Sequence, residues 1–294
     1  MPQESIRIPF LATLLAIALF SLMDATMKYA SIAVGAYSAT FLRSLLGFLL
    51  ALPLWLQNGA RWPSKPTLIV HVKRGIVGSF TALTFFYGLV RLPIAEAIAI
   101  SFIAPLVALM LAAALLKERI GRQARAAAVL GLLGVLVIAF GRTGAEVSHP
   151  EAAWGVAAVL LSAVLYAWNL ILQRQQALLA RPREVAVFQT AIATLVLGLA
   201  SPWLLVLPDS AGWISIAASA VLALGAVIVM SWAYARAETQ ALVPLEYTAF
   251  LWAILIGWLA FGEALTLPTL LGAGLIIVGC WIAAPRKHIE QTAL

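Results

Sequence analysis

The sequence predicts an all-α membrane protein in which ten transmembrane helices form two inverted five-helix repeats. Three observations support this prediction: the composition, the spacing of long apolar runs and an internal repeat. Of the 294 residues, 63% are apolar and only 11% are charged, and the mean hydropathy is +1.01. Soluble domains contain roughly 45–50% apolar and about 25% charged residues, so the solvent of this chain is expected to be lipid.

Ten apolar runs are long enough to serve as membrane crossings, since a helix needs about 20 predominantly apolar residues to span the bilayer. Charged residues, Pro and Gly separate these runs. They cover residues 9–30, 37–56, 68–90, 95–116, 124–140, 153–173, 185–207, 214–235, 242–262 and 265–284. The first run contains Asp24 and Lys28 and is too long for a signal peptide, so it is expected to remain as a helix.

Basic residues gather on one side of the predicted membrane. With the N-terminus placed in the cytoplasm, most of the 19 Lys and Arg residues fall in cytoplasmic segments. Lys28, Arg91 and Arg142 fall outside, and Arg43 lies within the second helix. The positive-inside rule therefore predicts that both termini are cytoplasmic, as an even number of helices requires. The expected location is the inner membrane of a bacterium, with multiple crossings.

An internal repeat predicts the architecture. Residues 95–139 align without a gap with residues 240–284, which places Glu118 on Glu263 and Gly134 on Gly279. The halves are then residues 1–144 and 145–294. Each half has an odd number of crossings, so the second must be inserted upside down relative to the first. Inverted repeats are typical of secondary transporters, whose substrate site lies between the repeats near the bilayer midplane.

The same rule predicts which helices surround a cavity. We expect the first four helices of each half to line it. The fifth and tenth helices carry small-residue faces, formed by Gly131, Gly134, Gly272, Gly274 and Gly279, and are expected to be peripheral. Such faces are used for helix packing or for pairing two chains in a homodimer.

Two sets of motifs, one in each half, carry a resemblance to a known family. They are YGLVRLPIAEA at residues 87–97, APL at 104–106 and ER at 118–119, followed by AETQA at 237–241, Pro244 and GEA at 262–264. Together they resemble the EamA-type transporters of the drug/metabolite transporter superfamily along essentially the whole chain. The resemblance implies movement of small organic solutes by alternating access without ATP hydrolysis. Asp24, Lys28 and the Phe41-Leu42-Arg43 segment resemble its S-adenosylmethionine-uptake and riboflavin-transporter-like branches.

Ionisable side chains within the bilayer are costly, so each is a hypothesis about function. Asp24 and Lys28 are four residues apart and share one helix face. Arg43 lies at a comparable depth, and Glu96 lies at the outer start of the fourth helix. These four residues converge toward the outer side of the membrane. They form either a neutral structural cluster or an outer gate or site for a zwitterionic solute.

The second half has milder side chains at the corresponding positions. Asn169 falls close to Asp24 in the repeat, and Gln189 matches Arg43. Glu246 lies just inside the ninth helix, with no obvious basic partner on its own helix face. It is interpreted either as a proton- or substrate-coupling group or as one half of an interfacial salt bridge.

Aromatic and kinked positions are further candidates for the cavity. Rings within the predicted helices provide stacking faces for flat or cationic solutes, although packing is the alternative role for each of them. The candidate rings are Tyr87, Tyr166, Trp168, Trp232, Tyr234, Tyr247 and Phe250. Pro105 lies in the middle of the fourth helix and frees the carbonyl of Ser101, which favours a kink facing a cavity.

The predicted function is secondary transport of a small organic metabolite that is amino-acid-derived, nucleoside-like, zwitterionic or cationic. The expected partners are this small-molecule substrate, the lipid bilayer, a coupling proton or counter-substrate, and a second copy of the chain; no nucleic acid is expected. An intramembrane enzyme is the first alternative, but no His-Asp pair, nucleophile motif or metal-ligand set occurs in the runs. A structural membrane protein is the second alternative. Such a protein would have no use for ionisable residues within its helices, which are energetically costly, as at Asp24, Arg43 and Glu246.

No catalytic residue, cofactor or metal ligand is predicted. The chain has a single cysteine, Cys280, which excludes an internal disulfide and a Cys-rich metal site. The sequence has no Gly-x-x-x-x-Gly-Lys phosphate loop, so ATP is not expected to drive the protein directly.

Overall fold

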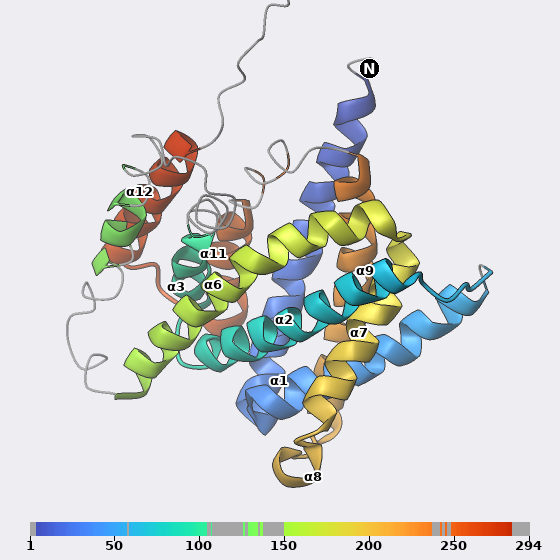
Figure 1. Cartoon of the computed structure of the whole chain (residues 1–294). Helices are drawn as coiled ribbons and strands as arrows, with labels where there is room; N and C mark the ends of the chain where they lie inside the picture. The colour runs from blue at the N-terminus through green and yellow to red at the C-terminus, as the bar shows by residue number, and fades with distance from the viewer. Residues whose placement is uncertain are drawn as a thin grey trace, which may run out of the picture.

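The computed structural model describes residues 4–57, 59–104, 150–236 and 248–283, together with residues 107, 126, 129–134, 136, 137, 242 and 245. Within these ranges all regular structure is helical and there is no strand. The helices are α1 (Glu4–Leu56), α2 (Lys65–Leu89), α3 (Ile94–Ser101), α6 (Pro150–Leu179), α7 (Pro182–Gly198), α8 (Ser201–Leu204), α9 (Ser210–Arg236), α11 (Thr248–Phe261) and α12 (Leu267–Ala283) (Figure 1).

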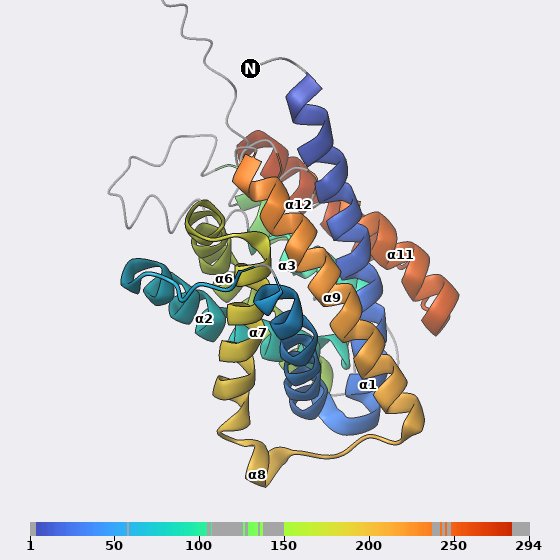
Figure 2. The same cartoon turned by 90° about the vertical axis from the view of Figure 1, so that its right-hand side faces the viewer.

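The helix α1 contains the first two predicted crossings. A straight helix of 53 residues would be about 80 Å long, far more than a bilayer is thick. Gly35 interrupts it with φ 82° and ψ 152°, a conformation that residues with a side chain rarely adopt. The chain bends there and turns back, as Figures 1 and 2 show.

Side-chain caps and prolines set the helix ends. At the start of α2, Ser64 accepts a hydrogen bond from the backbone nitrogen of Thr67 at 3.4 Å. The predicted helix over 185–207 ends early, at Gly198, because Pro202 has no N–H to donate to the Gly198 carbonyl. The Ser201 hydroxyl donates to that carbonyl instead, at 2.7 Å.

The helices pack in two similar pairs. The first half of α1 lies along the end of α9, where Ala16 and Ile17 meet Met230 and Tyr234. The helix α2 lies along α6 in the same way (Figure 1). Many large apolar side chains on the outer faces of these helices are exposed, as lipid-facing residues would be.

Four described helices are long and apolar enough to cross a membrane, namely most of α1, α2, α6 and α9. The shorter apolar helices α11 and α12 correspond to the predicted ninth and tenth crossings. The helix α3 contains the start of the fourth crossing, whereas Pro105 lies outside the described residues. Gly134 from the fifth crossing packs against the backbone of Gly272 in α12, so this small-residue face is used within the chain.

The largest apolar cluster of the described residues lies toward one end of the bundle. There the first half of α1 meets the turn between α2 and α3, and Met27, Leu89, Leu92 and Ile94 are fully or almost fully buried. At the opposite end lie the start of α2, the end of α6 and the start of α7. These two ends frame the cavity described below.

Candidate functional site

A cavity of about 340 Å³ lies between the helices. This volume is within the range of roughly 300–1,000 Å³ that is typical of small-molecule sites. Its lining comes from α1, α2, α3, α6, α7, α9 and α11. No described residue of the fifth crossing or of α12 lines it, in agreement with the predicted peripheral position of these two segments.

Asp24 and Arg43 face this cavity from the two halves of α1, but they do not form an ion pair closer than 4.0 Å. Arg43 lies close enough to act electrostatically on Asp24. Its guanidinium carbon lies 5.2 Å from the centre of the Phe86 ring, and one of its nitrogens lies 3.2 Å from the Met23 sulfur. A carboxyl group and a guanidinium thus face one space without forming an ion pair.

A second guanidinium, that of Arg74, lines the cavity and is only 6% exposed. It donates to the amide oxygens of Asn169 at 3.2 Å, of Gln173 at 3.0 Å and of Gln176. None of these partners is a carboxylate, and no described acid forms an ion pair with Arg74, although burying a cation without an anion is costly. Among the described residues, the charged side chains of the lining are therefore one carboxylate and two guanidiniums.

Gln189 adds an unsatisfied acceptor to the same wall. Its side-chain oxygen is buried and has no hydrogen-bond partner among the described residues. Because buried polar atoms are normally hydrogen-bonded, this oxygen is suited to accept a hydrogen bond from a bound solute. Asn169 and Gln189, the predicted counterparts of Asp24 and Arg43, thus line the same cavity as those two residues.

Lys28 does not join Asp24, although they share a helix face. Its ammonium forms an ion pair with Glu263, donates to the carbonyl of Leu92 at 2.9 Å and lies 5.1 Å from the centre of the Phe261 ring. Glu263 also accepts from the backbone nitrogen of Ile94 at 2.8 Å. We call the Lys28–Glu263 pair with these two backbone bonds the clamp. It ties α1 to the start of α3 and to the α11–α12 turn.

Glu96 lies near the clamp instead of near Arg43. Its side chain is buried, and it accepts from the hydroxyl of Thr269 at 3.4 Å. The four charges that the sequence placed together are therefore divided. Asp24 and Arg43 face the cavity, while Lys28 and Glu96 take part in closing one end of it.

The other predicted site residues have mixed positions. Ser101 and Tyr166 line the cavity. The cavity is not lined by the predicted rings of Tyr87, Trp232 and Phe250. Tyr87 is 39% exposed and lies against the guanidinium of Arg91. Trp232 lies against the guanidinium of Arg236, and Phe250 packs against Phe102. Glu246 and Tyr247 lie outside the described residues.

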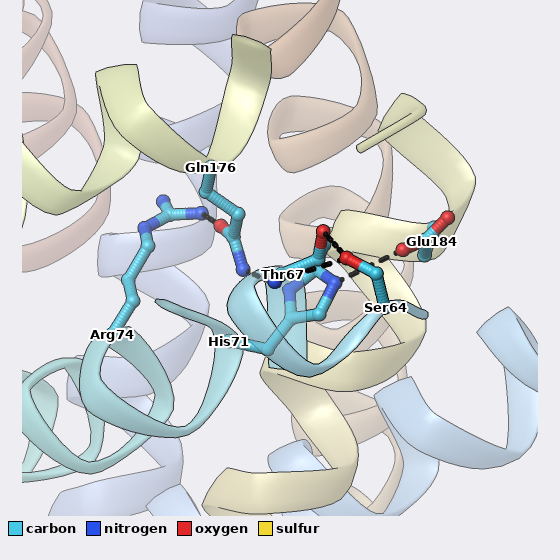
Figure 3. A network of polar contacts seen from close by, with 6 residues as sticks. All are labelled: Ser64, Thr67, His71, Arg74, Gln176 and Glu184. Atoms are coloured by element: carbon cyan, nitrogen blue, oxygen red, sulfur yellow. Dashed lines mark hydrogen bonds and ion pairs between the residues drawn. The ribbon is translucent and has the colours of Figure 1, made fainter. Parts of the chain in front are cut away.

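At the opposite end from the clamp, Arg74 belongs to a polar network that was not predicted (Figure 3). Gln176 links Arg74 to His71, whose other ring nitrogen lies 3.1 Å from a carboxylate oxygen of Glu184. The positive-inside count placed Arg74 with the cytoplasmic basic residues, although the run over residues 68–90 already contained it, and in the structure it lies inside α2. The sequence did contain a signal for this network. In α6, Asn169, Gln173 and Gln176 are spaced so that their side-chain amides lie on one face of the helix.

Among the described residues, no three His, Cys, Asp or Glu side chains are grouped so that they could hold a metal ion. The cavity instead combines separated charges, an open acceptor and apolar or aromatic walls that include Phe20, Phe85 and Phe86. Chemically, such a site is suited to hold a small solute that carries both an anionic and a cationic group.

Comparison with known proteins gives a consistent result. The profile of the EamA-like transporter family matches residues 7–140 and, a second time, residues 153–284. The pseudopaline exporter CntI of Pseudomonas aeruginosa is 29% identical over 267 residues, which cover 89% of this chain and 90% of that protein. An S-adenosylmethionine uptake transporter of Rickettsia felis is 26% identical over 291 residues, which cover 95% of each chain.

A solved crystal structure shares the fold, with a TM-score of 0.63 at 24% sequence identity over 96% of this chain and 97% of that one. The two ranges that match the family profile lie one in each predicted half of the chain.

Proposed function

The chain belongs to the EamA-like transporter family, and on that premise we propose that it carries a small zwitterionic organic solute across the bacterial inner membrane by alternating access. Membership confirms the resemblance predicted from the motifs and makes the chain a multi-pass membrane transporter. The observation that carries the finer proposal is the cavity, in which Asp24 and Arg43 present opposite charges without pairing.

The charge of the lining narrows the class of solute. Asp24 is suited to an ammonium group, whereas Arg43 and Arg74 are suited to carboxylates. Among the described residues, a solute with positive charge only would face two guanidiniums and one carboxylate, so it fits less well than an amino-acid-derived zwitterion. The aromatic walls favour a solute that also has an apolar or flat part.

Alternating access requires that the cavity be closed on one side at a time. The clamp and the apolar cluster beside it close the end that the basic-residue pattern assigns to the outside of the cell. Opening that end would separate Lys28 from Glu263. We therefore infer that the clamp is the outer gate of the transporter.

The inverted repeat remains part of this proposal. It is supported by the double match to the family profile and by the similar pairing of α1 with α9 and of α2 with α6. Orientation is tested by single cysteines in a Cys280→Ser background. We expect Ser210→Cys to react with an impermeant maleimide from outside the cell and Arg61→Cys only after permeabilisation. The reverse labelling would contradict the orientation.

The proposal is tested by uptake into proteoliposomes. Labelled S-adenosylmethionine and a panel of amino-acid-derived zwitterions are offered to the wild-type protein and to Asp24→Asn. We expect at least one zwitterion to accumulate unchanged in wild-type vesicles and not in the variant. Uptake of cations only, or chemical conversion of the solute, would overturn the proposal.

A further inference from the structure

The four residues Glu184, His71, Gln176 and Arg74, here called the His71 network, join three helices in one chain of hydrogen bonds (Figure 3). The imidazole of His71 is fully buried and stacks on Phe188, with ring centres 4.7 Å apart. The side chain of Glu184 is 18% exposed. One end of the network thus meets the surroundings, and the other end lines the cavity.

Arg74 determines where every proton in this network lies. A guanidinium only donates, so the side-chain oxygen of Gln176 must face it. The amide nitrogen of Gln176 therefore faces Nδ1 of His71, at 2.6 Å, and donates to it. Because Nδ1 accepts, the ring proton lies on Nε2 and is donated to Glu184 at 3.1 Å. The arrangement thus requires a neutral His71.

Protonation of His71 is incompatible with this arrangement. The added proton must reside on Nδ1, where it would point at the amide N–H₂ of Gln176 across 2.6 Å. If the amide rotates by half a turn to present its oxygen to His71, its N–H₂ group faces the guanidinium of Arg74 instead. In either case one hydrogen bond is lost, so Gln176 cannot hold His71 and Arg74 together once the ring is charged.

Two charged groups among the described residues act on His71 in opposite directions: the carboxylate of Glu184 favours a charged ring, as in the second arrangement, and the guanidinium of Arg74 disfavours it. Glu184 from α7 and Arg74 from its own helix are the charged groups that act on the ring, while α6 presents the neutral Gln176. The carboxylate of Glu184 stabilises a charged His71 ring. Both ring nitrogens then donate a hydrogen bond, Nε2 to Glu184 and Nδ1 to the side-chain oxygen of the rotated Gln176 amide. Arg74, whose side chain lines the cavity, keeps Asn169 and Gln173 but loses Gln176, so one of its three described hydrogen-bond partners no longer holds it.

We propose that the His71 network is a proton-dependent switch that releases Arg74 to bind a carboxylate of the transported solute. Protonation of His71 and binding of the solute anion then favour each other, so a proton and the solute are taken up together. This inference rests on the proposed function, and it names both a coupling ion and an acidic group that the solute must carry.

The switch is tested without a solute by nitrogen-15 NMR in lipid bilayers. The chain has three histidines, so His149→Asn/His288→Asn leaves His71 as the only imidazole. Arg74→Lys identifies the Arg74 resonances. We expect neutral His71 to carry its proton on Nε2, and the Arg74 Nη1 resonance to shift in the same titration step in which Nδ1 becomes protonated. An Nδ1–H tautomer, or Arg74 resonances that stay fixed while His71 titrates, would overturn the switch.

Gln176→Leu supplies the matched control. In that variant His71 should still titrate, but the Arg74 resonances should lose their response. For a solute found in the uptake screen, acidification should increase wild-type uptake, and Gln176→Leu should abolish that dependence. Equal pH dependence in both proteins would reject the switch and leave the proposed function standing. If no solute is transported, the proposed function fails, and the NMR titration still decides the switch.

Discussion

The two ends of the cavity are both held by a carboxylate and a basic side chain, but the two pairs differ in kind. At the clamp, Glu263 is 16% exposed and pairs with the ammonium of Lys28. At the His71 network, Glu184 is 18% exposed and lies next to the imidazole of His71, which is neutral in the arrangement inferred above. At similar exposure, the clamp is thus held by an ion pair, whereas the His71 network is held by hydrogen bonds that a proton can rearrange.

The largest expected effect comes from removing one charge of the clamp. Glu263→Gln removes the carboxylate that pairs with the buried ammonium of Lys28, and breaking a buried pair in this way typically costs about 3–5 kcal/mol. We expect a large decrease in the thermal unfolding temperature of the detergent-solubilised protein. Lys28→Met/Glu263→Gln should recover most of the lost stability. A single variant as stable as the wild type would show that the clamp is not a buried ion pair.

An intermediate effect is expected from the packing beside the His71 network. A Cβ at Gly75 would lie 2.6 Å from Cβ of Ile192, so α2 and α7 would have to separate. Overpacking of this kind typically costs about 1–3 kcal/mol. At Gly78 the nearest atom is the terminal amide nitrogen of Gln189, which can rotate away.

Gly75→Ala should therefore unfold at a lower temperature, and Gly78→Ala should fold normally but transport more slowly. Thermal unfolding and uptake, measured on both variants, separate the two effects. If Gly78→Ala lowers the unfolding temperature as much as Gly75→Ala does, the side chain of Gln189 cannot rotate away from the added methyl group.

The smallest effect on stability is expected at the other carboxylate. Glu184→Gln keeps an acceptor for the Nε2 proton of His71 and leaves no charge stranded, so we expect a loss of at most about 1 kcal/mol. The same substitution at Glu263 is its matched control, because the two side chains are almost equally exposed. If Glu184→Gln destabilises the protein as strongly as Glu263→Gln, His71 is charged in the resting state and the comparison of the two ends fails.

The sequence alone was sufficient to predict that most of the described residues form long apolar helices and to single out two charged residues that line the cavity. Apolar runs specify crossings because the bilayer sets their length, and Asp24 and Arg43 were recognisable because charges within such runs are rare. The early end of α7 was missed because one proline within an apolar run was not treated as a helix end.

The missed residues have a common physical cause. Arg74 lies about two turns inside α2, where a count of loop charges includes it with Lys73. His71 and the amides of α6 are neutral, so a search for buried charges passes over them. Likewise, the partner of Lys28 is 235 residues away in the chain, and only the folded structure brings Glu263 to it.

The central claim is that Asp24 and Arg43 act on the solute and are not a structural pair. It is tested most directly by uptake into proteoliposomes containing Asp24→Asn, Arg43→Gln or both substitutions, at equal amounts of folded protein. Because the two side chains are not ion-paired in the cavity, we expect each single variant to lose uptake and the double variant to remain inactive. Uptake restored in the double variant, or wild-type uptake in both single variants, would contradict this account.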